Sequence, residues 1–280
     1  MGLGRFEFTS GTAIVTGAAS GIGEQLAHGP ARRGTALALV DRDADRLEQV
    51  AEAARSRTAV PVATYVIDLA DDKAVRRLGE QLATEHPDAR LLINNAGAAL
   101  PGTFDQVSAE EFDWLLAVNF RSVVTLTRAL LPTLRAQSGA HLVNVSSVFG
   151  LIAPAGQVAY CTSKYAVRGF TEALRAELFE QVGATVVHPG GVRTRIAENA
   201  RIAAAVAGDA RRRDGDGIAR LLTYPPEWAA AQILDAVARR SPRLLIGMSA
   251  RLPDLMSRIS PALLSPVLLE AFRKRAARSA

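Results

Sequence analysis

Seven short apolar runs recur along the chain, and longer amphipathic stretches separate them. The runs are apolar at nearly every position, which is typical of strands in a parallel sheet that helices cover on both faces. They are TAIVTG from residue 12, ALALVD from 36, VATYVID from 62, RLLINNAG from 90, HLVNVSS from 141, ATVVHPG from 184 and RLLIG from 243. Helical patterns lie between them at 44–55, 72–85, 110–135 and 158–181. This alternation predicts an α/β fold with one doubly wound parallel sheet of about seven strands.

Two segments fall outside the alternation. Residues 194–224 are helical by composition but are interrupted by RRRDGDG, and their place after a strand end predicts a mobile flap. Residues 248–280 follow the last run and carry apolar side chains at helical spacing between three prolines. We therefore expect a single domain over 1–247 and an amphipathic helical C-terminal extension over 248–280.

Composition narrows the class of protein. The 280 residues are 49% hydrophobic and 22% charged, as in an ordinary globular chain with a sizeable core. The single cysteine, Cys161, excludes an internal disulfide framework and a cysteine metal cluster, and it suits a reducing compartment. No apolar run approaches the ~20 residues of a membrane span, and the N-terminus lacks the apolar core of a signal peptide. These features predict a cytoplasmic protein.

The formal net charge of +5 is concentrated at the C-terminus, where the last ten residues hold four basic side chains. No basic stripe interleaved with aromatic residues occurs, so nucleic acid is not expected as a partner. The basic, amphipathic tail admits two interpretations. It could lie on an anionic membrane surface as a peripheral contact, or it could pack on its own fold or on a neighbouring subunit, and we favour packing.

A glycine-rich turn, TGAASGIG at residues 16–23, follows the first run and opens a helical stretch. Glycines in this place permit a tight turn, let the backbone approach a pyrophosphate and expose amides at a positively polarised helix N-terminus. The spacing is G-x3-G-x-G, at Gly17, Gly21 and Gly23. Taken alone, the turn fits an ordinary strand-to-helix connection equally well.

Asp41 ends the second run, about 20 residues beyond the turn. Its carboxylate could accept hydrogen bonds from both hydroxyls of an adenosine ribose and would repel a 2′-phosphate. Alternatively, Asp41 caps the helix that starts near Ala44. Together with the glycine turn, Asp41 favours a dinucleotide cofactor, and NAD over NADP, although the neighbouring Arg42 leaves room for the phosphorylated form.

The stretch AYCTSKYAV at residues 159–167 holds one lysine and two tyrosines. Tyr160 and Lys164 are four residues apart and share a helix face, whereas Tyr165 is rotated by about 100°. The ordinary pKa of tyrosine is about 10, so acid–base chemistry near neutral pH requires a lower pKa, which the ammonium of Lys164 and the charge of an oxidised nicotinamide would together favour. Helical spacing alone does not separate packing from catalysis.

Several motifs occur together and in one order: TGAASGIG, NNAG at 94–97, Asn119, Ser147, YCTSK at 160–164 and HPGGVRT at 188–194. From about residue 10 to residue 247 this set resembles the short-chain dehydrogenase/reductase (SDR) family, in its common single-domain form. The resemblance implies a Rossmann-type fold and an NAD(P)-dependent oxidoreductase that interconverts a secondary alcohol and a ketone. One departure is HGP at 28–30, where Pro30 is expected to kink or shorten the first helix.

The resemblance assigns four catalytic residues. Tyr160 would exchange a proton with the substrate, while Lys164 would support Tyr160 and bind the nicotinamide ribose. Ser147, thirteen residues before Tyr160, would bind the substrate oxygen. Asn119 would hold a water that relays protons from Lys164 to solvent. Ser146 points to the opposite face of its strand, so only one of the two serines can serve.

The resemblance also implies the cofactor contacts. Asp68, with Leu69, would bind the adenine, and Val192 and Thr194 the nicotinamide carboxamide. The expected cofactor residues are Gly17, Ser20, Gly21, Ile22, Gly23, Asp41, Arg42, Asp68, Leu69, Asn95, Ala96, Gly97, Tyr160, Lys164, Pro189, Gly190, Val192 and Thr194. We expect His188 and Cys161 to be packing residues, and no cluster of ligating side chains indicates a metal.

The substrate class follows from apolar segments near the expected site. The flap and the apolar residues directly after Ser147 predict a lipophilic alcohol or ketone rather than a sugar. The resemblance further implies a homodimer or homotetramer, with the helices at 110–135 and 158–181 as subunit faces. A non-catalytic dinucleotide sensor or scaffold is the alternative, and the complete set of Asn119, Ser147, Tyr160 and Lys164 argues against it.

Overall fold

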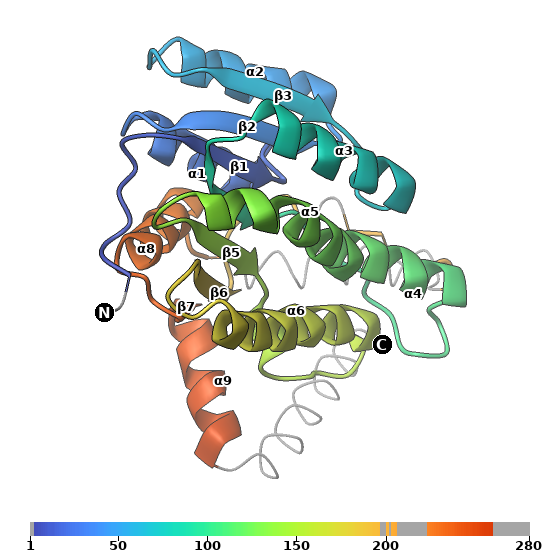
Figure 1. Cartoon of the computed structure of the whole chain (residues 1–280). Helices are drawn as coiled ribbons and strands as arrows, with labels where there is room; N and C mark the ends of the chain where they lie inside the picture. The colour runs from blue at the N-terminus through green and yellow to red at the C-terminus, as the bar shows by residue number, and fades with distance from the viewer. Residues whose placement is uncertain (1–2, 197–199, 202, 206–222, 260–280) are drawn as a thin grey trace.

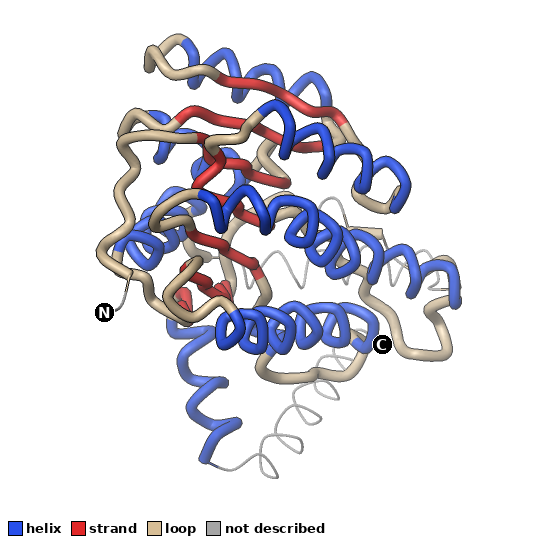
Figure 2. The backbone as a smooth tube through the Cα atoms, viewed as in Figure 1, coloured by secondary structure: helices blue, strands red, loops and turns tan. Residues whose placement is uncertain are grey.

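The computed structural model of the chain describes residues 3–196, 200–201, 203–205 and 223–259. Most of the predicted flap and residues 260–280 of the predicted extension lie outside the described residues. The described part forms one parallel sheet with helices on both faces, as Figures 1 and 2 show.

Seven parallel strands form the sheet in the order β3-β2-β1-β4-β5-β6-β7. Every run predicted as a strand is one, which confirms the predicted fold class. The strands are β1 (Thr12–Thr16), β2 (Ala36–Asp41), β3 (Val62–Val66), β4 (Ala89–Asn94), β5 (His141–Val145), β6 (Gly183–Pro189) and β7 (Arg243–Ile246). The chain order reverses at β1, which pairs with both β2 and β4. The carboxyl ends of the strands at such a switch point form the crevice where doubly wound sheets bind ligands.

Two helical layers bury the two faces of the sheet (Figure 1). Each layer has a core of its own, built around Leu26, Leu47 and Ile233 on one face and around Leu82, Leu126 and Leu134 on the other. The first layer contains α1 (Gly21–Ala31), α2 (Ala44–Arg55) and α8 (Pro226–Ala238), and the second contains α3 (Asp72–Glu85), α5 (Ser122–Ala136) and α6 (Val158–Glu177). Helix α1 ends one residue beyond Pro30, as expected of a proline that shortens it.

The helix predicted at 110–135 is divided by a π-helical turn. It consists of α4 (Ala109–Leu116), the π turn η1 (Ala117–Arg121) and α5. Ser108 and Glu111 start it with a complete capping box. Its 28 residues contain an 18-residue window with a mean hydropathy of 1.2, which would suit a membrane span by length and composition, a test that core helices also pass. Here the helix packs against α3, α6 and β4.

Helix α9 (Met248–Ile259) follows β7 directly and extends away from the sheet in Figure 1. Its inner face holds the buried Asp254, which forms ion pairs with Arg243 of β7 and with Arg258. The outer face carries an apolar stripe of Met248, Leu252, Leu255 and Ile259, which are 62%, 53%, 53% and 75% exposed. The described part of the C-terminal extension is therefore an amphipathic helix. The ion pair between Asp254 and Arg243 holds it to β7, and its solvent-exposed face is apolar.

Candidate active site

The glycine turn between β1 and α1 has a backbone that other residues could not adopt easily. Gly17 and Gly21 have φ values of +68° and +57°, in the left-handed region. A Cβ added at Gly23 would lie 1.8 Å from the main-chain oxygen of Gly17. Ser20 is the N-cap of α1 but makes no side-chain capping bond within the described chain, so the first amides of the helix remain available to an anion. The turn thus fits a pyrophosphate.

Asp41 lies beside this turn at the carboxyl end of β2. Its carboxylate accepts hydrogen bonds from three main-chain amides, those of Ala19 (3.0 Å), Arg42 (2.7 Å) and Asp43 (3.1 Å). Asp43, and not Asp41, caps α2 by accepting from the amide of Arg46. The alternative that Asp41 is a helix cap is therefore wrong. The carboxylate is instead fixed next to the turn, where an adenosine ribose would lie, and the side chain of Arg42 is exposed.

The segment after β4 is tied to the same turn. The side-chain amide of Asn95 donates to the main-chain oxygens of Thr16 (3.0 Å) and Gly17 (3.3 Å). The hydroxyl of Thr16 accepts from the amides of Asn95 and Ala96. Further along the edge, Asp68 follows β3 and accepts from the amide of Ala70. The sheet therefore collects the residues expected around the adenosine and pyrophosphate at one edge.

Tyr160 and Lys164 lie on the buried face of α6, with 8% and 3% of their surface exposed. The Nζ atom of Lys164 is 5.8 Å from the centroid of the Tyr160 ring and donates to the main-chain oxygen of Val145 (3.1 Å). A Cβ added at Gly97 would lie 3.1 Å from this Nζ, so the NNAG segment passes directly over the lysine. Tyr165 is 40% exposed on another side of the helix, as the helical spacing predicts.

Ser146 and Ser147 point to different neighbours, in agreement with the alternation along a strand. Ser147 caps a short 3-10 turn, η2 (Val148–Gly150), by accepting from the amide of Phe149 (3.2 Å), and its hydroxyl is near enough to Tyr160 to lower the pKa of the phenol. Ser146 is buried and its hydroxyl donates to the main-chain oxygen of Lys164 (2.8 Å). Ser147 is therefore the serine that meets Tyr160, and Ser146 joins β5 to α6.

Asn119 lies in the π turn and is completely buried. Its Oδ1 accepts from the amide of Ala98 (2.8 Å), and its Nδ2 donates to the oxygen of Ala98 (3.0 Å) and to Ser163 Oγ (3.0 Å). Ser163 in turn donates to the main-chain oxygen of Tyr160 (2.7 Å). Both amide protons and one oxygen lone pair are thus engaged, which leaves one lone pair of Oδ1 for a relay water.

Burial dominates the ionisation of Tyr160 and Lys164 in the protein alone. Burial raises the pKa of Tyr160 to about 12, and the nearby hydroxyl of Ser147 offsets this only in part. Burial also lowers the pKa of Lys164 to about 8. In the protein alone, desolvation of the phenolate outweighs its neighbours, so the downward shift of the pKa of Tyr160 stays a prediction for the complex with an oxidised nicotinamide. Burial raises the pKa of the Cys161 thiol to about 12, which fits the expected packing role.

The segment after β6, residues 189–194, which is expected to contact the nicotinamide, returns to the glycine turn. Thr194 lies beside Gly21, where an added Cβ would be 3.1 Å from the Thr194 methyl group. The amide of Gly190 donates to the oxygen of Ile246 (3.0 Å), and that of Gly191 donates to Ser249 Oγ (3.0 Å). Sequence reasoning missed Ser249, because this contact joins residues 58 apart.

His188 was expected from the sequence to be a packing residue, but it also makes a contact with a residue of the site. Its Nδ1 lies 2.9 Å from the main-chain oxygen of Ser147. The sequence did contain a signal: His188 lies at the end of its apolar run, next to Pro189. In the sheet this end of β6 lies beside the end of β5, which Ser147 follows. Among the described residues, no group of three or more His, Cys, Asp or Glu side chains could hold a metal ion.

Comparison with known proteins places the chain among dehydrogenases. The model of the short chain dehydrogenase family matches residues 11–204. The oxidoreductase SadH of Mycobacterium tuberculosis is 37% identical over 256 residues, which cover 90% of this chain and 91% of SadH. Dehydrogenase/reductase SDR family member 7B of Xenopus laevis is 30% identical over 272 residues, covering 94% of this chain and 82% of that protein.

Solved structures show the same fold. A short-chain dehydrogenase/reductase of Burkholderia phymatum, in complex with NAD, superposes with a TM-score of 0.83 at 27% identity and covers 93% of this chain and 97% of its own. A short-chain dehydrogenase of Sphingobium yanoikuyae, in complex with NADPH, has a TM-score of 0.71 at 28% identity, with 90% and 95% covered. Motifs, fold and relatives agree: the chain belongs to the short-chain dehydrogenase/reductase family.

Proposed function

We propose that the protein is an NAD-dependent oxidoreductase that interconverts a lipophilic secondary alcohol and its ketone. The observation that carries the proposal is the convergence of Ser147, Tyr160 and Lys164 beside Gly97 and the glycine turn. Bound NAD would supply the hydride acceptor, and its reduced form the donor. The residues of the chain would then bind, orient and deprotonate the substrate.

Ser147 and Tyr160 have different roles at the substrate oxygen: Ser147 binds it, and Tyr160 exchanges a proton with it. Because Phe149 N–H occupies a lone pair of Ser147 Oγ, the serine proton is free to turn toward an oxygen placed between Ser147 and Tyr160. The phenolate of Tyr160 takes the alcohol proton, and the phenol returns it to the ketone in the reverse direction. A pKa of about 12 is too high for this near neutral pH, so additional positive charge near the ring is required. The oxidised nicotinamide would supply such a charge in addition to the ammonium of Lys164.

The first test is Tyr160→Phe, with Cys161→Ala as the matched control. Phenylalanine keeps the ring but removes the proton-transferring hydroxyl, so kcat should fall by about three orders of magnitude or more while NAD affinity stays near the wild-type value. Cys161→Ala alters a buried neighbour with no assigned chemistry and should retain most activity. Full activity of Tyr160→Phe would refute the mechanism. NAD binding without turnover of any substrate would instead support a sensor or scaffold.

The preference for NAD rests on Asp41. Three main-chain donors hold its carboxylate in place, and a 2′-phosphate would approach this negative charge closely. We expect the wild type to have a higher kcat/KM with NAD than with NADP, and Asp41→Ser to reduce or invert that ratio. A wild-type preference for NADP would contradict the assignment.

The lipophilic substrate class rests on the apolar walls of the site. Phe149 contacts the Tyr160 ring edge-on, and Leu151 and Ile152 form a buried cluster just beyond Ser147. Leu100 and Ala203 pack with Tyr160 on another side. A spectrophotometric panel of lipophilic alcohols and ketones beside polar polyols tests the class. Turnover of polyols alone would exclude it.

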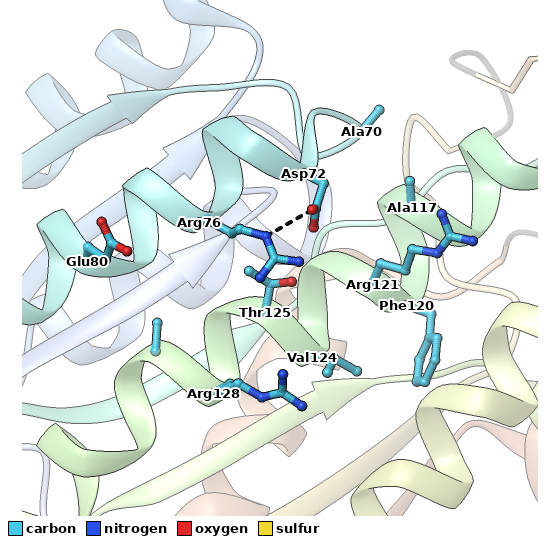
Figure 3. Close-up of a pocket in the computed structure, with 11 residues that line it drawn as sticks. Ala70, Asp72, Arg76, Glu80, Ala117, Phe120, Arg121, Val124, Thr125 and Arg128 are labelled. Carbon is cyan, nitrogen blue, oxygen red and sulfur yellow. Dashed lines mark hydrogen bonds and ion pairs between the residues drawn. The ribbon is translucent and has the colours of Figure 1, made fainter.

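A homodimer or homotetramer is the expected assembly, with the helical layer of α5 and α6 as its contact face. A groove of about 660 Å³ lies between α3 and α5 and is separate from the catalytic residues. Figure 3 shows Arg76 directed toward Asp72 on one wall, and Val124 and Arg128 on the other. Val124→Asp should shift the protein toward monomer in light scattering, whereas the same change at the exposed Ser56 should not. An unchanged mass would exclude this face.

The exposed apolar stripe of α9 bears on whether the C-terminal extension packs on protein or contacts a membrane. We favour its burial against a neighbouring subunit or the same chain over peripheral membrane contact, and we place the protein in the cytoplasm. Leu252→Glu combined with Leu255→Glu should then alter the oligomer mass or the solubility of the full chain. Wild-type sedimentation with anionic liposomes, lost in this variant, would support the membrane instead.

A further inference from the structure

We propose that His188 is a positioning residue for Ser147, acting through a hydrogen bond to the main-chain carbonyl of that serine. The inference rests on the function proposed above. His188 ends the buried part of β6, and its Nδ1 is 2.9 Å from the Ser147 oxygen. The amide of Gly150 donates to the same oxygen at 2.9 Å, so the Ser147 carbonyl is held from two directions.

The chemistry of the contact determines which ring nitrogen carries the proton. A carbonyl oxygen can only accept, so Nδ1 of His188 must be the donor. Burial lowers the pKa of His188 to about 4, which keeps the ring neutral near pH 7 with a single N–H. Nε2 is then unprotonated, and it is buried without a hydrogen-bond partner among the described residues.

This unpaired nitrogen explains what the histidine contributes. An unpaired polar atom in the interior costs free energy, which an aliphatic side chain would avoid. The two preceding residues of β6, Val186 and Val187, are aliphatic and completely buried. The property that valine or leucine would lack at position 188 is the donor to Ser147. We infer that the hydrogen bond to the Ser147 carbonyl is what compensates for the free-energy cost of the unpaired Nε2.

The contact matters because Ser147 lies outside the regular strand. β5 ends at Val145, and Ser147 is held by the short η2 turn that it caps. Rotation of its peptide would move Oγ relative to the Tyr160 hydroxyl, whose pKa the Ser147 hydroxyl lowers. His188 connects this peptide to the neighbouring strand and resists the rotation, so that the substrate oxygen meets both hydroxyls at once.

A pair of substitutions tests the role. His188→Leu removes the donor but retains bulk, and His188→Asn retains an amide donor close to the position of Nδ1. We expect His188→Leu to lower kcat about tenfold or more with the KM for NAD changed by less than about twofold, and His188→Asn to recover most of kcat. Wild-type kcat in His188→Leu, or equal losses in both variants, would overturn the proposal.

A second measurement does not depend on turnover. Nitrogen-15 NMR of the histidine side chains reports which ring nitrogen is protonated, and the signal lost in His188→Asn identifies His188. The proposal requires the Nδ1–H tautomer, and an Nε2–H tautomer would overturn it. If the wild type oxidised no alcohol while His188 showed the Nδ1–H tautomer, the proposed function would fail and the hydrogen bond to Ser147 would stand.

Discussion

Replacing Lys164 by methionine should make the protein more stable while abolishing its activity. Lys164 is 3% exposed, and burial alone lowers its pKa from 10.5 to about 8. At about 1.4 kcal/mol per pH unit, carrying this charge costs roughly 3 kcal/mol of the free energy of unfolding at pH 7. Methionine removes that cost but also the hydrogen bond to Val145, which is worth about 1 kcal/mol. The net expectation is a gain of about 2 kcal/mol.

Urea unfolding of the NAD-free protein at several pH values measures this gain. The folded state disfavours the charged lysine, so the penalty is complete below pH 8 and disappears as the pH rises toward 10.5. The difference between Lys164→Met and wild type should therefore be largest near pH 7 and shrink above pH 8. Lys73→Met, at an exposed position of α3, should leave stability within about 0.5 kcal/mol. A variant less stable than wild type at pH 7, or a difference independent of pH, would refute the reasoning.

Three further substitutions probe the turn and the extension. Gly23→Ala should abolish NAD binding in calorimetric titration, because the new Cβ would lie 1.8 Å from the oxygen of Gly17. Gly169→Ala, where nothing lies within 4 Å, should retain NAD affinity and add about 0.5–1 kcal/mol of stability. Asp254→Ala should lower the free energy of unfolding by about 3 kcal/mol, since it leaves Arg243 unpaired. Burial favours the neutral form of Asp254, but Arg243 outweighs burial and lowers the pKa of the carboxyl. The difference in the free energy of unfolding between Asp254→Ala and wild type should therefore vanish as the pH falls through that pKa. Unchanged NAD affinity in Gly23→Ala, or an Asp254→Ala deficit that persists in acid, would contradict these expectations.

The fold could be predicted from sequence because burial on both faces leaves strands almost uninterrupted by polar residues. All seven strands were located in this way. The π turn around Asn119 could not be predicted, since it changes the hydrogen-bond spacing of a helix without a change in its apolar pattern. The helix cap at Asp43 rather than Asp41 is a shift of two residues, within the usual uncertainty of helix ends.

The site was predictable where local geometry decides and not where burial or distant contacts decide. Helical spacing placed Tyr160 with Lys164, and strand alternation separated Ser146 from Ser147. The direction of the pKa shift of Tyr160 depends on how much protein covers the ring, which spacing does not report. The partner of His188 is 41 residues away in the chain and becomes adjacent only when β5 and β6 pair.

The hydrogen bond from Gly191 to Ser249 has a consequence for the design of variants. Ser249 belongs to the first turn of α9, and Met248 N–H donates to the Tyr224 hydroxyl in the same corner. Helix α9 therefore supports the segment at 189–194, which is expected to contact the nicotinamide, and the residues on either side of position 247 are not separable parts. We expect a truncation or fusion made there to weaken cofactor binding. A shortened enzyme for engineering should therefore retain α9 to at least Asp254, whose ion pair with Arg243 anchors the helix.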